Sequence, residues 1–539
     1  MIRRLGASIS FDDVAAGARF LGGARAFLRR PFSLEQARAT LRSRLERREA
    51  SFLALVDRAV YRHAASPYRQ LLGLAGCESG DLERLVYQEG IEGALHSLYR
   101  RGVYLTVDEY KARRPVVRGS ATLTVRPEGL RNPSSASHVA VRTSGSRGAG
   151  TRVGIDLAFV RDHAVNTHLT LEAHGGTDWL HAHWGVPGGT AIVNLLEFAM
   201  GGTPPVRWFS QLDTAASGVH PRYRWSSRVV RWTSFVTGVP LPSPVYVPLQ
   251  EPLPIARWMA DVVQTGNTTH LWTYASSAVQ VCRAALAAGI DLGGARFTAG
   301  GEPLTAARLA LIRRSGAQVA PRYGATETDI IGYACLAPEA PDDQHLLHDR
   351  LALIQPRPDP ERTGLPPLAL LVTSTLATAP VILLNVSLGD QAVLVQRTCG
   401  CPLERLGWAT HLHTIRSFEK LTAGGMTFLD TDVIRVLEEV LPARFGGGPT
   451  DYQLLEEEAG DGQPRLRLLV HPAIGPLAAE AVAEAFLAAI GDRSEGERVM
   501  ALHWREGGFL QVERGAPLTT SSGKILHLHQ PRPIMRYQS

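Results

Sequence analysis

The sequence predicts an α/β protein in which a large N-terminal domain of layered sheets with covering helices precedes a small α+β C-terminal domain. Three observations lead to this prediction. The 539 residues are more than one ordinary domain contains. Between about residues 120 and 415, β-branched runs alternate with helical patterns, as in sheets covered by helices. From about residue 416 a more compact α+β pattern follows.

The elements are expected in a definite order. Residues 1–115 should form a helical region packed on the large domain, because segments 33–60 and 80–102 carry apolar residues three and four positions apart. The large domain should span 116–415. Its predicted strands include the β-branched runs 121–127, 137–144 and 151–160. Segment 269–290 is predicted as strand, loop and helix, and segment 294–329 as strand, loop, helix, strand and loop.

The small domain should span 416–539, with its boundary near 413–420. Its pattern rests on segments 429–441, 464–472 and 475–491. The Pro-rich segment 356–367 is expected to be a loop of the large domain, not a linker between domains.

Composition excludes several classes of function. The net charge of +6 is mild and the arginines are scattered, so we expect no nucleic-acid partner. No apolar run reaches the roughly 18–20 residues that span a bilayer. The N-terminus is basic but lacks an apolar segment, so we expect a cytoplasmic protein without a secretory signal. The five cysteines are an odd number, which makes a disulfide framework unfavourable.

Lysine is rare in this chain. It occurs only at Lys111, Lys420 and Lys524, whereas every other basic residue of the 57 is Arg. Positions where Lys persists are therefore candidates for sites that need a compact ammonium instead of a planar guanidinium.

The glycine-rich segment 141–150 looks like a phosphate loop. It contains G-x-x-x-x-G from Gly145 to Gly150, but Thr151 and Arg152 follow where a Walker A loop has Lys and Ser/Thr. It also lies between two predicted strands, whereas a Walker A loop leads into a helix. Two interpretations stay open at this point: a loop that binds phosphate through hydroxyls and backbone N–H groups, or a surface hairpin turn.

Four further segments carry polar residues at the ends of predicted elements. Segment 298–305 follows a strand and opens a helix, and 322–329 places Thr326 and Glu327 at the C-terminal end of a strand, where open sheets bind ligands. Asp390 is expected in a tight Gly-Asp turn before a strand. Lys524 lies in a Ser/Gly loop near the end of the chain.

The order of these motifs resembles the adenylate-forming superfamily of acyl-CoA synthetases and adenylation domains. The motifs are T-S-G-S-x-G, G-G-E-P, Y-G-A-T-E, G-D, a basic hinge region and a terminal S-G-K. The G-G-E-P spelling and the stretch LEEVLPARF are most similar to the phenylacetate–CoA ligase branch. The resemblance covers roughly residues 135–530, and Y-G-A-T-E is its most specific motif.

The resemblance implies a role for each motif residue. The β- and γ-phosphates of ATP would be held by Thr143, Ser144, Gly145, Ser146, Arg147 and Gly148. The nucleotide pocket would be lined by Gly300, Gly301, Glu302, Tyr323 and Gly324. Thr326 would touch the α-phosphate, Glu327 would bind Mg²⁺ and Asp390 the ribose. Arg416 would precede the interdomain hinge of a mobile small domain, and Lys524 would be the catalytic lysine.

The chemistry explains these residue types. A carboxylate attacks the α-phosphate of ATP and expels pyrophosphate, so the site must neutralise charge that builds in the transition state. Mg²⁺ on Glu327 and the ammonium of Lys524 would do so. The chain departs from the family at the hinge, where Phe418 and Glu419 stand in place of the common Asp, and after the loop, where Arg152 would compensate for a missing Pro-Lys pair.

A second kind of site is indicated by the cysteines. Cys399 and Cys401 form a C-x-C pair, which is typical of a metal site in a reducing compartment. With Cys335 and His345 they resemble the Cys₃His structural zinc of the phenylacetate–CoA ligase branch. His348 is the alternative fourth ligand, and thiols without metal are the alternative to the site itself. Cys77 and Cys282 lie in apolar helical stretches and are expected to be packing residues.

The acid pocket is less well marked. Trp272 and Tyr274 fall where relatives place acyl-pocket residues and would suit an aromatic acid, and His183, from a segment with His181 and Trp184, could join them. For that segment, a polar loop beside the site is the favoured interpretation, and a pocket role is the alternative.

The expected reaction is ATP-dependent activation of a carboxylic acid followed by acyl transfer to the thiol of coenzyme A. Transfer to a carrier-protein thiol or an amine, and AMP transfer to a cofactor, are the alternatives within the class. A zinc-stabilised binding protein that has lost catalysis is the alternative outside enzymes, but Glu327, Asp390 and Lys524 argue against it. The resemblance is compatible with a homodimer, and we expect no membrane partner.

Overall fold

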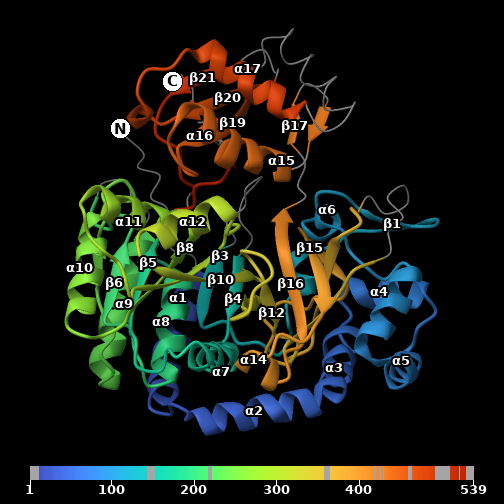
Figure 1. Cartoon of the computed structure of the whole chain (residues 1–539). Helices are drawn as coiled ribbons and strands as arrows, with labels where there is room; N and C mark the ends of the chain where they lie inside the picture. The colour runs from blue at the N-terminus through green and yellow to red at the C-terminus, as the bar shows by residue number, and fades with distance from the viewer. Residues whose placement is uncertain are drawn as a thin grey trace, which may run out of the picture.

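The computed structural model describes residues 11–142, 152–216, 221–356, 365–417, 421–423, 426–428, 430–458, 464–491, 510–520 and 523–529. In these residues a large mixed sheet with covering helices carries a small α/β subdomain at its C-terminal end (Figure 1). The predicted fold class is confirmed. The loop Thr143–Gly148 and the hinge positions 418–420 lie outside the described residues.

The N-terminal part is helical. Ser33 begins the second helix with a capping box, in which its hydroxyl accepts from the backbone of Gln36 and the Gln36 side chain accepts from the backbone of Ser33. The long fifth helix bends at Gly90, where φ is +70°. The elements are α1 (Phe11–Leu28), α2 (Leu34–Glu46), α3 (Arg48–Val56), η1 (Asp57–Tyr61), α4 (Pro67–Leu74), α5 (Ser79–Arg100), α6 (Val107–Tyr110), β1 (Val116–Arg118), β2 (Ala121–Leu123) and η2 (Pro127–Leu130).

These helices share one hydrophobic core with the sheet. Leu95, Leu98 and Leu105 are buried in the same cluster as the strand residues Leu371 and Val386. The side chain of Asn385 donates to the backbone oxygens of Leu95 (2.8 Å) and Val103 (3.1 Å). The N-terminal helices are therefore anchored to the strands at one side of the sheet.

The central sheet has twelve strands in the order β13-β14-β15-β16-β12-β11-β10-β9-β8-β5-β6-β7. The strands from β10 to β7 in this order run parallel to their neighbours, and the others pair antiparallel. The strands are β5 (Leu180–Gly185), β6 (Arg207–Ser210), β7 (Pro244–Tyr246), β8 (Thr269–Tyr274), β9 (Arg296–Gly300), β10 (Gln318–Ala325), β11 (Asp329–Ala334), β12 (Gln344–Leu346), β13 (Leu351–Ile354), β14 (Ala369–Ser374), β15 (Val386–Gln396) and β16 (Thr410–Ser417).

Helices connect and cover these strands, as the alternating pattern predicts. The connecting helices are α7 (Leu157–Ala173), α8 (Gly189–Met200), α9 (Pro221–Thr237), α10 (Leu253–Gln264), α11 (Ala275–Ala287), α12 (Ala306–Arg314) and α14 (Pro402–Arg405). A separate antiparallel pair, β3 (Val139–Arg142) with β4 (Arg152–Ile155), flanks the glycine-rich loop. The predicted strands on both sides of that loop are thus present.

The small subdomain, from residue 421 onward, has its own sheet and core. Its four-stranded sheet has the order β21-β20-β19-β22, and its buried residues include Leu437, Leu454, Leu468 and Phe486. Its elements are β17 (Leu421–Ala423), β18 (Met426–Phe428), α15 (Asp430–Arg435), η3 (Val436–Val440), α16 (Leu441–Phe445), β19 (Tyr452–Glu458), β20 (Pro464–Val470), η4 (Pro472–Ile474), α17 (Ala479–Ile490), β21 (Leu510–Arg514) and β22 (Leu528–His529). Figure 1 shows it above α12, at the top of the main body.

Four local predictions are wrong. Residues 180–185, favoured from the sequence as part of a polar loop, form β5, in which His181 and His183 are buried. The strand predicted over 151–160 ends at Ile155, because Asp156 caps α7 by accepting from the backbone N of Ala158 at 2.8 Å. The loop predicted after β8 is absent, since α11 begins directly after Tyr274. Asp390 does not lie in a turn: Gly389 has φ +95°, but β15 continues through it and Asp390 pairs with Ser417 of β16.

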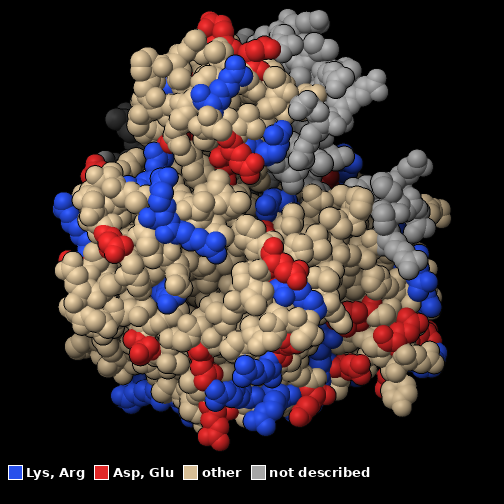
Figure 2. Space-filling model, viewed as in Figure 1, with Lys and Arg blue, Asp and Glu red and all other residues tan. Residues whose placement is uncertain are grey.

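Charge and hydropathy agree with the composition. On the face in Figure 2, basic side chains of the described residues are interspersed with acidic ones. Within the described residues, every helix is too short or too polar to cross a bilayer.

Buried histidines make stability depend on pH. Burial lowers the pKa of four of them from 6.5: to about 4 for His163 and His168, and to about 3 for His181 and His183. As the pH falls from about 6.5 to about 4, the unfolded chain protonates these side chains while the folded protein does not. The unfolded state therefore binds more protons, and each histidine lowers the free energy of unfolding by roughly 1.4 kcal/mol per pH unit.

We expect the free energy of unfolding, measured by urea denaturation, to decrease from pH 7 to pH 5. Burial raises the pKa of Glu197 and Glu327, so the folded state holds protons there that the unfolded state releases, which opposes part of the slope. Four histidines should outweigh two carboxyl groups. A constant or increasing stability toward pH 5 would contradict this expectation.

Candidate functional site

The C-terminal ends of three parallel strands meet at one edge of the sheet. In the register Tyr274 of β8 lies opposite Gly300 of β9, and Gly300 lies opposite Arg322 of β10. This is the edge at which open parallel sheets bind ligands. Gly301 follows with φ +74°, and a Cβ built there would lie 3.1 Å from the ring of Tyr274. A glycine is therefore needed both for the backbone conformation and for the close approach.

Lys524 reaches this edge from the small subdomain. A turn brings it there, in which the backbone N of Thr520 donates to the oxygen of Lys524 at 2.8 Å. Its Nζ lies 5.4 Å from the centre of the Tyr274 ring. A Cβ built at Gly301 would lie 3.0 Å from the Cε of Lys524, so the lysine side chain passes close to this glycine. Burial lowers the pKa of Lys524, while Glu302 and Asp390 act in the opposite direction. The ammonium thus lies in an enclosed position among the motif residues.

Tyr323 and Asp390 are brought together from separate motifs. The Tyr323 hydroxyl donates to Asp390 Oδ2 at 2.8 Å. Next to Tyr323, Gly324 cannot be replaced freely, because a Cβ there would lie 2.2 Å from the backbone oxygen of Asp329. The exposed backbone of Gly324 and the Tyr323–Asp390 pair together form one wall of the strand-end site.

Glu302 is oriented inward. Its carboxylate accepts from the backbone N and the hydroxyl of Ser276, at 2.8 and 2.9 Å, and from Arg308 at 2.9 Å. These three contacts fix the loop that carries Gly300 and Gly301.

Thr326 and Glu327 follow β10, as predicted. Thr326 is half-buried, whereas Glu327 is 7% exposed and accepts from the Tyr110 hydroxyl at 3.4 Å. Burial raises the pKa of Glu327 above its usual value, and Lys111 and Tyr110 offset only part of this rise. The carboxylate borders a small cavity shared with His163, Thr328 and Arg350.

Arg416 lies one residue before the end of β16, which is the last strand of the central sheet in chain order. Its Nη1 donates to Asp342 Oδ2 at 2.9 Å, and Asp342 also accepts from the backbone N of Thr414 and Ile415. Arg416 pairs with Gln391 in the register and so lies next to Asp390. The residue before the hinge is therefore held at the rim of the same site.

The predicted acyl-pocket residues lie on neighbouring strands. Trp272 is 1% exposed and lies under the guanidinium of Arg322, 3.9 Å from its ring centre. His183 is also buried, and Tyr274 is half-buried at the open end. Arg322 was not singled out by the sequence, although its position directly before Tyr323 in a strand places it at the same edge.

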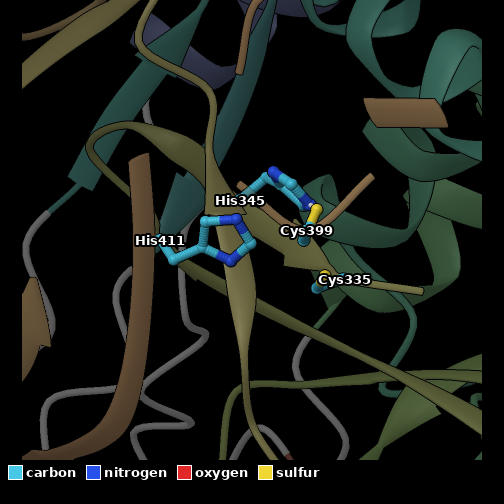
Figure 3. A group of neighbouring side chains, drawn as sticks. All are labelled: Cys335, His345, Cys399 and His411. Carbon is cyan, nitrogen blue, oxygen red and sulfur yellow. Dashed lines mark hydrogen bonds between the residues drawn. The ribbon is translucent and has the colours of Figure 1, made fainter. Parts of the chain in front are cut away.

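The cysteine and histidine residues predicted as a metal site also converge. His345 Nε2 lies 3.1 Å from Cys401 Sγ and 3.6 Å from Cys399 Sγ. Ligand atoms of Cys335, His345, Cys399 and His411 all lie within 4.8 Å of one another. Figure 3 shows these four side chains as neighbours. Around a tetrahedral zinc, nitrogen and sulfur ligands would be about 3.5 Å apart, by the usual bond lengths.

The surroundings of this cluster suit a metal. His345 Nδ1 lies 2.6 Å from the backbone oxygen of Trp408, which directs Nε2 at the sulfurs. Glu404 accepts from the backbone N of Cys399 and Gly400, at 2.9 and 2.6 Å. Arg397 lies 3.7 Å from Cys335 Sγ and would balance the excess negative charge of three thiolates.

Two histidines near the cluster behave differently. His348, the alternative ligand from the sequence, lies against Arg48, which donates to its backbone oxygen at 2.6 Å. His411, which the sequence did not single out, stacks beside His345 with ring centres 4.1 Å apart. Its Nδ1 contacts Asp343 at 2.9 Å, and its buried Nε2 has no hydrogen-bond partner among the described residues. A buried ring nitrogen left in this way is the kind of atom that a metal would satisfy.

Comparison with known proteins gives a fold. No family model and no curated protein matches the chain. Two crystal structures of 2-hydroxyisobutyryl-CoA ligase in the postadenylation state, in complex with R3-HIB-AMP and with 2-HIB-AMP, are similar. Each has a TM-score of 0.53 and 14% sequence identity, and the match covers 91% of this chain and 90% of that chain. The chain therefore has the fold of that acyl-CoA ligase over nearly its whole length.

Proposed function

We propose that this protein activates a carboxylic acid with ATP as an acyl-adenylate, releases pyrophosphate and transfers the acyl group to the thiol of coenzyme A. The observation that carries the proposal is the position of Lys524 against Gly301 and Tyr274, at the edge where the Tyr323–Asp390 pair also lies. Four of these groups come from four motifs in distant parts of the sequence, and the fifth, Tyr274, ends β8. The similar ligase structures hold an acyl-adenylate, which supports the same chemistry here.

The nucleotide would lie along the strand ends. Asp390 would accept from the ribose hydroxyls, and Tyr323 and the backbone around Gly301 and Gly324 would bound the adenine. Thr326 would contact the α-phosphate, and the loop Thr143–Gly148, which lies outside the described residues, would hold the terminal phosphates.

Glu327 fits a role in binding Mg²⁺. Its carboxylate follows β10 at the strand-end site, and oxygen ligands are those that this cation prefers. When bound, the cation would offset negative charge on the phosphates. Burial raises the pKa of Glu327 and so disfavours its ionised form. A bound cation would favour the ionised carboxylate and lower that pKa.

Lys524 would act where the negative charge gathers. The attacking carboxylate and the α-phosphate repel each other, and an ammonium between them lowers that repulsion most when water is excluded. Its position beside Gly301 and Tyr274 fits this role. Arg416, at the rim beside Asp390, would help to hold the nucleotide and would mark the start of the movable part of the chain.

The cysteine cluster fits a structural zinc. Cys335, His345, Cys399 and Cys401 would be its four ligands, and His411 is a neighbour that could replace one of them. Bound zinc would cross-link the segment around Cys335 to the segment before β16 and would take no part in the reaction.

The finer proposals follow the resemblance to phenylacetate–CoA ligases. Trp272, Tyr274 and His183 would line the pocket of an aromatic or planar acid. A carrier-protein thiol or an amine is the alternative acceptor. The boundaries after residues 115 and 415, the cytoplasmic location and a homodimer stay predictions.

Acid-dependent exchange of pyrophosphate with ATP tests this function. Purified protein with ATP, Mg²⁺ and labelled pyrophosphate should exchange label only when a suitable acid from a panel of aryl, fatty, hydroxy and amino acids is present. The positive acid should then give an acyl-CoA when coenzyme A is added. Exchange without any acid, or none with the whole panel, would count against acyl-adenylate formation.

A further inference from the structure

A buried cluster of charged side chains joins the main body to the small subdomain. Arg308 of α12 is 1% exposed and contacts carboxylates from both parts. Its Nη1 donates to Glu302 of the main body at 2.9 Å, and its Nε donates to Glu438 of η3, in the subdomain, at 2.7 Å. Glu438 is 3% exposed and also accepts from the Thr305 hydroxyl. The junction therefore contains ionised groups that water does not reach.

His527 adds the terminal segment to this cluster. Its Nε2 lies 3.1 Å from Arg308 Nη2 and also contacts Glu438 Oε1. Its backbone oxygen accepts from Leu454 of β19 at 2.8 Å, which ties it to the subdomain sheet. Burial alone would raise the pKa of Glu438, but Arg308 and His527 lower it to about 2, so this carboxylate is ionised at neutral pH.

The contacts continue from the cluster to the lysine. Ser276, which donates to Glu302, accepts at its hydroxyl from the backbone N of Ile525 at 3.4 Å. Ile525 directly follows Lys524, and His527 lies three residues after Lys524. On the other side, Gly301 precedes Glu302 and lies against the Lys524 side chain. The cluster thus fixes the chain on both sides of the contact between Lys524 and the main body.

We propose that Glu438 is a positioning residue: through Arg308 and His527 it holds the terminal segment so that Lys524 lies against Gly301 and Tyr274. Removing its charge leaves Arg308 buried with one carboxylate instead of two, and a buried charge that loses a partner is strongly destabilising. The junction can relieve this cost by opening to water, which withdraws Lys524. The placement of Lys524 stands independently of the reaction, whereas its importance for catalysis rests on the proposed function.

The scarcity of lysine provides a direct measurement of this placement. An endoproteinase specific for lysine can cut the chain only after Lys111, Lys420 and Lys524. Cutting after Lys524 requires the terminal segment to leave the junction, and its rate follows the population of the open form. Mass spectrometry distinguishes this cut from the one after the exposed Lys111, which serves as an internal reference.

We expect Glu438→Gln to increase the cutting rate at Lys524 by at least about tenfold over the wild type, with the rate at Lys111 unchanged. The matched control is Glu513→Gln, which removes an exposed ion pair with Arg467 inside the subdomain and should leave both rates unchanged. His527→Gln should act in the same direction as Glu438→Gln. If Glu438→Gln cut at the wild-type rate at Lys524, the proposal would be wrong, and equal acceleration at Lys111 would indicate general unfolding and would also overturn it.

The effect on catalysis is measured separately. With an acid that supports exchange, Glu438→Gln should lower kcat by at least about tenfold while the KM for ATP changes by less than about threefold. The reason is that displacement of Lys524 reduces stabilisation of the transition state more than it reduces the affinity for ATP. A higher KM with an unchanged kcat would contradict a positioning role. Absence of exchange in the wild type would refute the proposed function but would leave the proteolysis result interpretable.

Discussion

Lys524→Ala is expected to abolish acid-dependent pyrophosphate exchange, with a loss of at least about 10²–10³-fold in kcat, as when one preorganised charge-stabilising group is removed. The reason is geometric and electrostatic. Lys524 places an ammonium beside Gly301 and Tyr274, where the reacting carboxylate and phosphate would meet. Alanine keeps the backbone turn but leaves that repulsion unopposed. The measurement is exchange with the best acid of the panel.

Two controls make this result specific. Glu513→Gln removes an ion pair with Arg467 inside the subdomain and should alter exchange by less than about threefold, since surface groups away from the site contribute little. Lys524→Arg should be nearly as inactive as alanine, because a planar guanidinium differs in size and shape from the compact ammonium that lies close to Gly301. An alanine variant that exchanges at the wild-type rate would remove Lys524 from the mechanism.

Cys399→Ser is expected to release zinc and to lower the thermal stability of the protein. Metal analysis of the wild type should find about one zinc per chain, and the serine variant should hold little, because a tetrahedral site with three remaining ligands binds metal much more weakly. If the loss costs about 3 kcal/mol, the melting temperature should fall by roughly 3 °C, because the entropy of unfolding is large for a protein of this size. Removal of zinc from the wild type by a chelator should have a similar effect.

The control for the metal is a cysteine outside the cluster. Cys77 is buried among the N-terminal helices, away from the cluster. The Cys77→Ala variant should therefore retain zinc even if its thermal stability is lower. Comparison of His345→Ala with His411→Ala identifies the nitrogen ligand: we expect zinc loss for the former and retention for the latter. A metal-free wild-type protein with full stability would refute the zinc site.

Several features of the site could be predicted because they depend on rare residue types in short patterns. The cysteines 335, 399 and 401 and the His345 ring stand out in a chain with few cysteines, and they do converge. Lys524 stands out in the same way. The order of strands and helices from β8 to β10 could also be predicted, since periodicity and glycine are local signals.

The errors have a common cause. Gly389 with positive φ looks like a turn residue in the sequence, but the hydrogen bonds to β16 keep the strand continuous through Asp390. The strand predicted over 151–160 was too long because Asp156, an effective N-cap, was read as part of the strand. In both cases a partner far along the chain, or a cap, decided between two local conformations.

The sequence by itself determined the fold class, the motifs and the residue types that can carry the chemistry, because hydrophobic period, turn residues and side-chain chemistry act over a few neighbouring positions. Only the tertiary structure decided which distant groups meet. Arg308, Glu438 and His527 are separated by up to 219 positions in the chain, and no local pattern indicates that they meet. They form one cluster because packing the subdomain on α12 removes water from all three, so that each charge must find its partner there.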